Sequence, residues 1–177
     1  MATIIKTEME KYIKELEQNA NKLLETVKEY SIEKLTEKSG SEWSLLEILE
    51  HIYITDKVIY SIISKPSDKE SKAKELFGQN KLEIILIDQR DKKIQSPDFL
   101  HPKGHFKNLS DFNSEFIDLR NSLKNDLITE KVKIDNRIHN HPLLGEMTIT
   151  DWLNFILFHT ERHLKQIEER NTVANNV

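Results

Sequence analysis

The 177-residue sequence contains no cysteine. This absence excludes a disulfide framework, a cysteine-ligated zinc site and a thiol nucleophile supplied by the protein itself. No apolar run approaches the ~20 residues that a helix needs to span a bilayer. The segment from Met1 to Glu8 also lacks the apolar stretch of a secretory signal. Together these absences predict a soluble, cytoplasmic protein that does not enter a membrane.

An excess of charge of one sign is also missing. The 26 basic and 30 acidic residues leave a net charge of only −4, and the two signs are interspersed. There is no basic stripe to indicate nucleic-acid binding and no acidic tail to indicate a cationic partner. Apolar residues make up 37% of the chain, which suffices for one core. The length is short for two independent cores, so we expect a single domain over residues 1–177.

The scarce glycines and prolines, four of each, fall outside the strongly periodic segments. Within those segments, apolar residues recur at steps of three and four, which predicts amphipathic helices. We expect four long helices: about Thr7–Tyr30, Leu45–Ser64, Ser110–Leu127 and about Thr150–Arg170. Capping boxes are predicted at the start of the first two, from Thr7 with Glu10 and from Ser44 with Glu47.

The segments between these helices carry weaker signals. A short helix is predicted over about Leu82–Lys92, and Ser96–Gly104 reads as irregular because it holds two prolines. Residues Val132–Ile138 favour at most a short extended piece, followed by a turn at Pro142–Gly145. The predicted fold is therefore all-α, a four-helix bundle with a long crossover between its second and third helices and almost no strand.

The seven histidines are the natural place to look for chemistry, because a neutral imidazole is both a metal ligand and a base near neutral pH. His159 and His163 are four residues apart on the last predicted helix, so they share one face. His51 lies on the second predicted helix. Two histidines from one helix and a third from another would suit a metal site with open positions. By itself this spacing is weak evidence of a metal site, because it is also found in partly buried histidines that bind no metal.

Three motifs resemble those of the DinB-like superfamily. The string Glu42-Trp43-Ser44, followed by Glu47 and His51, resembles the second-helix signature of these proteins. The string Trp152-Leu153-Asn154-Phe155, followed by His159, Arg162-His163 and Gln166-Ile167, resembles their last-helix signature. The turn His141-Pro142-Leu143-Leu144-Gly145, with Met147-Thr148 after it, resembles the turn that leads into that helix. The resemblance covers nearly the whole chain.

This resemblance implies a four-helix bundle and a divalent metal, zinc or nickel, held by three histidines. Matched position by position, the ligands are His51, His159 and His163. Proteins of this kind include thiol S-transferases that use bacillithiol or mycothiol, a maleylpyruvate isomerase and metal-dependent hydrolases. The resemblance therefore implies a hydrolase or a low-molecular-weight-thiol S-transferase that acts on a small molecule. By the same analogy the chain forms a homodimer.

Two other functions stay open at this point. One is a non-catalytic metal-binding module with a role in stress response, and the other is a helical bundle without metal. The bound metal, if there is one, is not identified by the sequence, because histidine ligands suit several divalent ions.

Two further residues are candidates for catalysis. Glu47 lies one turn before His51, so its carboxylate would coordinate the metal, orient His51 or act as a general base. The alternative is that Glu47 only completes the capping box. His141 lies in the turn before the last helix, where it would contact substrate or simply bond to the backbone of its own loop.

For several other polar side chains the sequence allows either a functional or a purely structural role. Arg162 either binds an anionic substrate or makes a structural contact, and His101 and His105 either reach the mouth of the bundle or lie in solvent. His139 is expected at the surface, and Asp56 has no assigned role.

Overall fold

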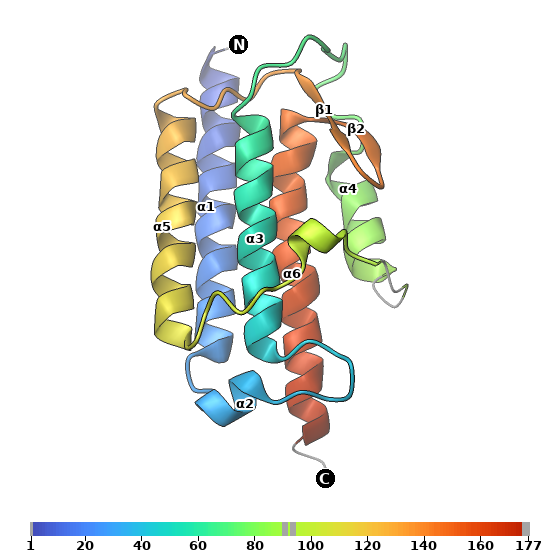
Figure 1. Ribbon diagram of the computed structural model, residues 1–177. Coiled ribbons are helices and arrows are strands. Elements are labelled where there is room, and N and C mark those ends of the chain that lie inside the picture. The colour runs from blue at the N-terminus through green and yellow to red at the C-terminus, as the bar shows by residue number, and fades with distance from the viewer. Residues whose placement is uncertain (1, 90–91, 93–94, 175–177) are drawn as a thin grey trace.

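Four long helices stand side by side and form a bundle (Figure 1). The computed structural model describes residues 2–89, 92 and 95–174. The long helices are α1 (Ala2–Val27), α3 (Leu45–Ile63), α5 (Leu109–Ile128) and α6 (Ile149–Ala174). The shorter elements are α2 (Ile32–Thr36), α4 (Gly78–Glu83), the π-helical turn η1 (Ile84–Asp88), the 3-10 turn η2 (Asp98–Leu100), β1 (Ile138–His141) and β2 (Gly145–Thr148). The four-helix bundle and the long crossover between α3 and α5 are thus confirmed.

The beginning of α3 follows the local sequence. The Ser44 hydroxyl accepts a hydrogen bond from the Glu47 amide at 3.2 Å, and the Glu47 carboxylate accepts one from the Ser44 amide at 2.8 Å. Both bonds of the predicted capping box are present, so two backbone N–H groups at the helix terminus are satisfied. This cap fixes where α3 begins and therefore the position of His51 on it.

Three predictions of local structure were wrong in detail. Helix α1 begins at Ala2 and ends at Val27, so Thr7 lies inside the helix and not at its beginning. The residues before Thr7 include no proline or glycine to stop the helix. Helix α4 begins before the predicted Leu82, and its π-helical continuation ends at Asp88. Of the predicted segment, residues 90 and 91 lie outside the described residues.

The strands of the described residues are limited to one small hairpin, in agreement with the expectation of almost no strand. Strands β1 and β2 pair antiparallel, from Ile138 opposite Thr148 to His141 opposite Gly145. Gly145 has a φ of 81°, a conformation that an L side chain adopts only with strain. Contacts from the start of the crossover support the hairpin, because the Ile138 amide donates to the Lys69 carbonyl at 2.9 Å and the Ser67 hydroxyl donates to the Ile138 carbonyl at 2.6 Å. Such distant contacts are invisible to a local pattern.

Two buried carboxylates fasten the crossover to the bundle. Near the start of the crossover, Asp151 of α6 accepts hydrogen bonds from the amides of Leu76, Phe77 and Gly78 at 2.8–3.1 Å. Near its end, Glu50 of α3 accepts hydrogen bonds from the amides of Lys103 at 2.6 Å and His105 at 3.0 Å. Because an unpaired buried carboxylate is costly, each of these residues holds its segment in place.

A single guanidinium links all four long helices. Arg120 of α5 donates to Asp56 of α3 at 2.7 Å and to the Thr160 hydroxyl of α6 at 2.9 Å, and a weaker contact at 3.5 Å reaches Asn19 of α1. Both charged partners are buried, with 5% and 2% of their surfaces exposed. Burial raises the pKa of the Asp56 carboxyl to about 6, against the opposing effect of Arg120. This cluster fixes how the helices are aligned along the bundle.

The described part of the chain includes no helix that is both long enough and apolar enough to cross a bilayer.

Arg120→Met is expected to lower the free energy of unfolding by about 3–5 kcal/mol, because it leaves the Asp56 carboxylate buried without its partner. The measurement is urea unfolding at pH 7, followed by circular dichroism. The double variant Asp56→Leu with Arg120→Met removes both charges and should recover much of the loss. A loss below about 1 kcal/mol in the single variant would contradict the stabilising role of the pair.

Candidate metal centre

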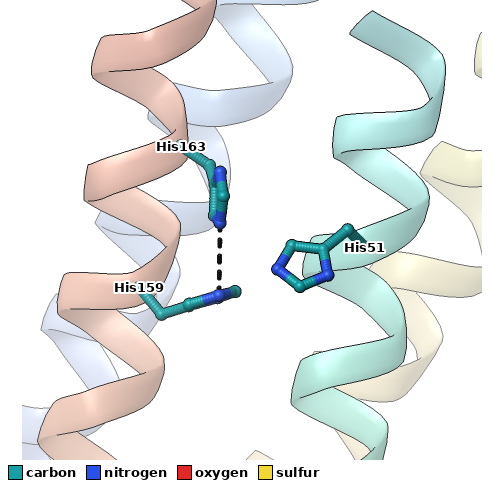
Figure 2. Close-up of side chains that lie close together, drawn as sticks. All are labelled: His51, His159 and His163. Atoms are coloured by element: carbon teal, nitrogen blue, oxygen red, sulfur yellow. Dashed lines mark hydrogen bonds between the residues drawn. The ribbon is translucent and has the colours of Figure 1, made fainter. Parts of the chain in front are cut away.

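Three imidazole rings from two helices converge between α3 and α6. Successive turns of α6 carry His159 and His163, and His51 faces them from α3 (Figure 2). The ring centroid of His51 lies 5.1 Å from that of His159 and 4.9 Å from that of His163. One ring nitrogen from each residue can be chosen so that all three lie within 4.8 Å of one another. The structure therefore brings together the three residues that the sequence analysis selected.

The spacing of the nitrogens fits a single metal ion. The Nε2 atoms of His159 and His163 are 3.2 Å apart. Two imidazole nitrogens that each bind one zinc ion at ~2.0–2.1 Å with tetrahedral angles lie about 3.3 Å apart. In the described residues this is the one group of three metal-ligating side chains so placed. The group would supply three ligands and leave further coordination positions for water or substrate.

The hydrogen bonds of two rings decide which nitrogen is available. The Nδ1 of His51 lies 2.9 Å from the Leu100 carbonyl oxygen, which can only accept, so this nitrogen carries the proton. The Nδ1 of His163 lies 2.9 Å from the Gln166 side-chain oxygen and is the donor in the same way. In both rings the lone pair is left on Nε2. Such partners hold a ligand in one tautomer and one orientation.

The surroundings keep the three imidazoles neutral. Burial is the main cause that lowers the pKa of each ring, and neighbouring histidines add to it. The pKa of His163 falls to about 3, and that of His159 is well below its ordinary value. His51 and His159 are only 4% and 7% exposed. Neutral rings have free lone pairs, which metal binding requires.

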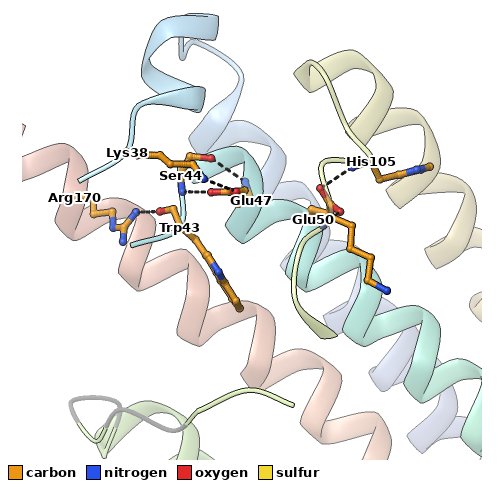
Figure 3. A network of polar contacts seen from close by, with 8 residues as sticks. Lys38, Trp43, Ser44, Glu47, Glu50, His105 and Arg170 are labelled. Carbon is orange, nitrogen blue, oxygen red and sulfur yellow. Dashed lines mark hydrogen bonds and ion pairs between the residues drawn. The ribbon is translucent and has the colours of Figure 1, made fainter. Parts of the chain in front are cut away.

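Aromatic rings enclose two of the histidines. Trp43 lies against His51 with ring centroids 4.9 Å apart, and Phe155 is stacked on His159 at 5.6 Å. The carbonyl of Trp43 in turn accepts a hydrogen bond from Arg170, as Figure 3 shows. Each of these two imidazoles therefore has an aromatic ring packed against it.

The carboxylate of Glu47 is engaged at the beginning of its own helix. It bonds to the Ser44 amide and pairs with Lys38 at 2.8 Å (Figure 3). No hydrogen bond or ion pair found in the described part of the chain connects it to His51. The capping interpretation is therefore observed, whereas a role for Glu47 as a base or ligand stays a prediction.

His141 does not contact the three histidines directly but is connected to His159 through the ring of Phe155. Its ring is 4.9 Å from Phe155, which is the residue stacked on His159. Its Nδ1 accepts hydrogen bonds from the amides of Leu143 and Leu144, both at 3.1 Å. The loop-bonding interpretation is thus observed, and the position leaves a contact with substrate open.

Of the other candidate site residues, one lies near the three histidines and two are bound to other groups. His101 lies near the site, with its ring 5.5 Å from Trp43, whereas His105 pairs with Glu115 at 2.9 Å. Arg162 donates to the carbonyls of Leu86 and Lys92 at 2.9 and 3.3 Å. These bonds give Arg162 a structural role at the end of η1.

Sequence analysis missed two contributors to the site. Glu50, beside His51 in the sequence, accepts hydrogen bonds from the amides of Lys103 and of His105, the second of which is drawn in Figure 3. These bonds hold the loop whose Leu100 carbonyl contacts His51. The sequence did contain a signal for Glu50, because a glutamate that directly follows Ile48 and Leu49 on an apolar helix face is expected to have a buried polar partner. The role of Leu100 belongs to its backbone, so no residue pattern signals it.

Comparisons with known proteins bear on the family and the fold. A sequence model of the DinB superfamily matches residues 15–167. The chain is 31% identical over 144 residues to the uncharacterized protein YuaE of Bacillus subtilis (strain 168), which covers 81% of this chain and 86% of the relative. The fold is similar to the crystal structure of TT2238, a four-helix bundle protein, with a TM-score of 0.59 and 16% identity over 91% of this chain and 98% of that one.

Gln166→Leu is expected to weaken divalent-metal affinity by about 10-fold, because loss of a ligand's hydrogen-bond partner typically costs 10–100-fold. The measurement is competition of zinc between the protein and a chromogenic chelator. Gln18→Leu, an exposed change on α1, is the matched control and should leave affinity unchanged. Equal affinities in the two variants would show that Gln166 does not support the ligand.

The metal-free protein is expected to lose stability as the pH falls from about 6.5 towards 4. Burial lowers the pKa of His141 to about 4 from 6.5, so the unfolded chain takes up a proton before the folded one does. The stability from this residue is fully present above pH 6.5 and declines below it. Urea unfolding at pH 7.5 and pH 5, in the presence of chelator, should show a smaller decline in His141→Asn than in the wild type. An equal decline would contradict the shift.

Proposed function

The chain belongs to the DinB superfamily, and on that premise we propose that it is a metal-dependent enzyme whose His51, His159 and His163 hold one zinc or nickel ion. The observation that carries this proposal is the convergence of three buried, neutral imidazoles from two helices within 4.8 Å. Three protein ligands leave room for a small molecule, which is the arrangement of catalytic rather than structural zinc sites.

Each residue of the site has a distinct part in this proposal. A divalent ion supplies a Lewis acid at neutral pH. His51 and His163 present their Nε2 lone pairs because the Leu100 carbonyl and Gln166 hold the protons on Nδ1. Trp43 and Phe155 keep water from the flanks of His51 and His159. Low water content strengthens every electrostatic interaction with a bound substrate.

Two reaction classes suit this site. One is hydrolysis of an ester or amide, and the other is transfer of a low-molecular-weight thiol, of the bacillithiol type, to an electrophile. Because the chain has no cysteine, the thiol in the second reaction would come from the substrate. The homodimer and the cytoplasmic location stay predictions.

One observation favours a non-catalytic alternative, a metal-binding module. Glu47 is engaged by Ser44 and Lys38, and Glu50 is engaged by the amides of the crossover. The two glutamates next to His51 are thus occupied, and a proton-transfer group has to come from elsewhere. Turnover measurements separate this alternative from the enzyme.

Protein purified without a histidine tag is expected to contain about one divalent ion per chain, since three converging imidazoles form one site. His159→Ala should lose most of this metal, because two imidazoles bind an ion much more weakly than three. His105→Ala, which changes a histidine paired with Glu115, is the control and should keep it. Elemental analysis by mass spectrometry gives the stoichiometry.

The metal-loaded protein should then turn over substrates in one of two panels, activated esters or thiol–electrophile pairs, and His163→Ala should abolish that activity. Stoichiometric metal without turnover in either panel would favour the binding module. Absence of metal from the wild type after zinc or nickel reconstitution would refute both.

A further inference from the structure

A groove lies between α3 and the last part of the crossover, which passes in front of this helix in Figure 1. One side of the groove is a stripe of α3 whose lining residues recur at steps of three and four from Glu50 to Ser61. The other side is formed by residues of the segment from Phe99 to His105. The volume of about 600 Å³ is typical of small-molecule sites. Of the described residues that line the groove, none belongs to the three-histidine centre, so this is a separate place on the molecule.

Three apolar side chains line the groove. Ile54 and Val58 of α3 are only half-buried, and Phe99 of η2 is 54% exposed. Among the large apolar side chains that the described residues expose, Phe99 is the one aromatic ring. An apolar group that covers these side chains would remove their surface from water, which is favourable. The apolar side of the groove therefore suits a ring or a short hydrocarbon chain.

Two ammonium groups line the same groove. They belong to Lys57 of α3 and Lys103 of the crossover, and neither forms a hydrogen bond or an ion pair with another described residue. Glu50 also lines the groove, but it is only 1% exposed and its two oxygens accept hydrogen bonds from the amides of Lys103 and His105. The charge that the groove presents to solvent is therefore positive.

A carboxylate of the neighbouring helix α5 is already engaged by other groups. Glu115 accepts a hydrogen bond from the Tyr53 hydroxyl at 2.9 Å and pairs with His105 at 2.9 Å. These hydrogen bonds are the main causes that lower the pKa of Glu115, and the charge of Lys57 adds a smaller effect. Because Glu115 does not line the groove and makes no ion pair with Lys57, both ammonium groups remain accessible to an anion from solvent.

We propose that this groove binds a small amphipathic carboxylate. The apolar part of the ligand lies on Phe99, Ile54 and Val58, and its acidic group pairs with the ammonium groups of Lys57 and Lys103. Lysines act as point charges and suit a single acidic group. A polyanion is disfavoured, because the chain as a whole carries a net charge of −4. This site is additional to the proposed metal centre and needs no bound metal.

The probe is 2-naphthoate, a flat aromatic carboxylate, and the comparison ligand is 2-naphthamide, which has the same shape and no charge. Each is titrated into the full chain labelled with ¹⁵N, and the amide signals of the protein are followed by NMR. Naphthoate should shift the signals of residues around Phe99 and Lys103 until they saturate. Naphthamide should bind about 5-fold more weakly, since it forms no ion pair with the lysines.

Variants of the lining residues test the two parts of the site separately. Lys57→Gln combined with Lys103→Gln should raise the Kd for naphthoate about 5-fold or more and leave that for naphthamide unchanged. Lys14→Gln combined with Lys72→Gln is the matched control, because it removes the same charge from two exposed lysines outside the groove, and it should match the wild type. Phe99→Ala should weaken the binding of both ligands, since both cover this ring.

Binding in the groove must also be distinguished from binding to a metal. Phe99 directly precedes Leu100, whose carbonyl contacts His51. The affinity for naphthoate should therefore be measured with and without excess EDTA, and it should be the same. A loss of affinity in EDTA would place the anion at the metal centre and overturn the proposal.

Three other results would contradict a carboxylate site in the groove. One is the absence of saturable shifts around Phe99 in the wild type, and another is an unchanged Kd for naphthoate in the double variant of Lys57 and Lys103. The third is a wild-type dimer that does not bind naphthoate and dissociates in Phe99→Ala, which would assign the groove to a second copy of the chain. Sedimentation velocity of both proteins tests this last result.

Discussion

The contact of the Arg120 guanidinium with all four long helices is the interaction on which the rest of the structure depends. Its two strongest bonds reach Asp56 and Thr160. Asp56 follows His51 on α3 by five residues, and Thr160 is adjacent to His159 on α6. An apolar interface alone tolerates sliding of one helix along another, whereas a buried ion pair must keep its partners in place or leave a charge unpaired. The cluster therefore sets the height at which His51 faces His159.

The crossover depends on the same principle of buried charge. Asp151 holds the start of α4, and Glu50 holds the segment after η2, each through backbone amides. The segment from η2 to the beginning of α5 passes in front of α6 and α3 in the view of Figure 1. The Leu100 carbonyl thereby reaches His51 and determines its tautomer. A connection of irregular shape thus contributes to the chemistry of the site as directly as the helices do.

Burial gives the histidine cluster its chemical character. Protonated imidazoles packed this closely would repel one another and lose their solvation, and the lowered pKa values of His51, His159 and His163 express both effects. The result is a group of neutral imidazoles that lie close together, with the aromatic rings of Trp43 and Phe155 packed against two of them. His141 follows the same logic at the edge of the site, where its turn fixes the tautomer.

Local patterns in the sequence determined the four long helices and the capping box of Ser44 with Glu47, because periodicity and cap spacing are properties of neighbouring residues. The resemblance to the DinB-like superfamily selected the three histidines, which the structure brings together. The local patterns failed at Thr7, where a capping pattern lies inside a longer helix, and they did not place β1 and β2, which contacts from Ser67 and Lys69 support. The pairing of Asp56 with Arg120 and the bond from His51 to Leu100 join residues 64 and 49 positions apart. Partners so distant meet only when the chain is folded, so the tertiary structure alone decided which nitrogen of His51 is available and how the helices are aligned.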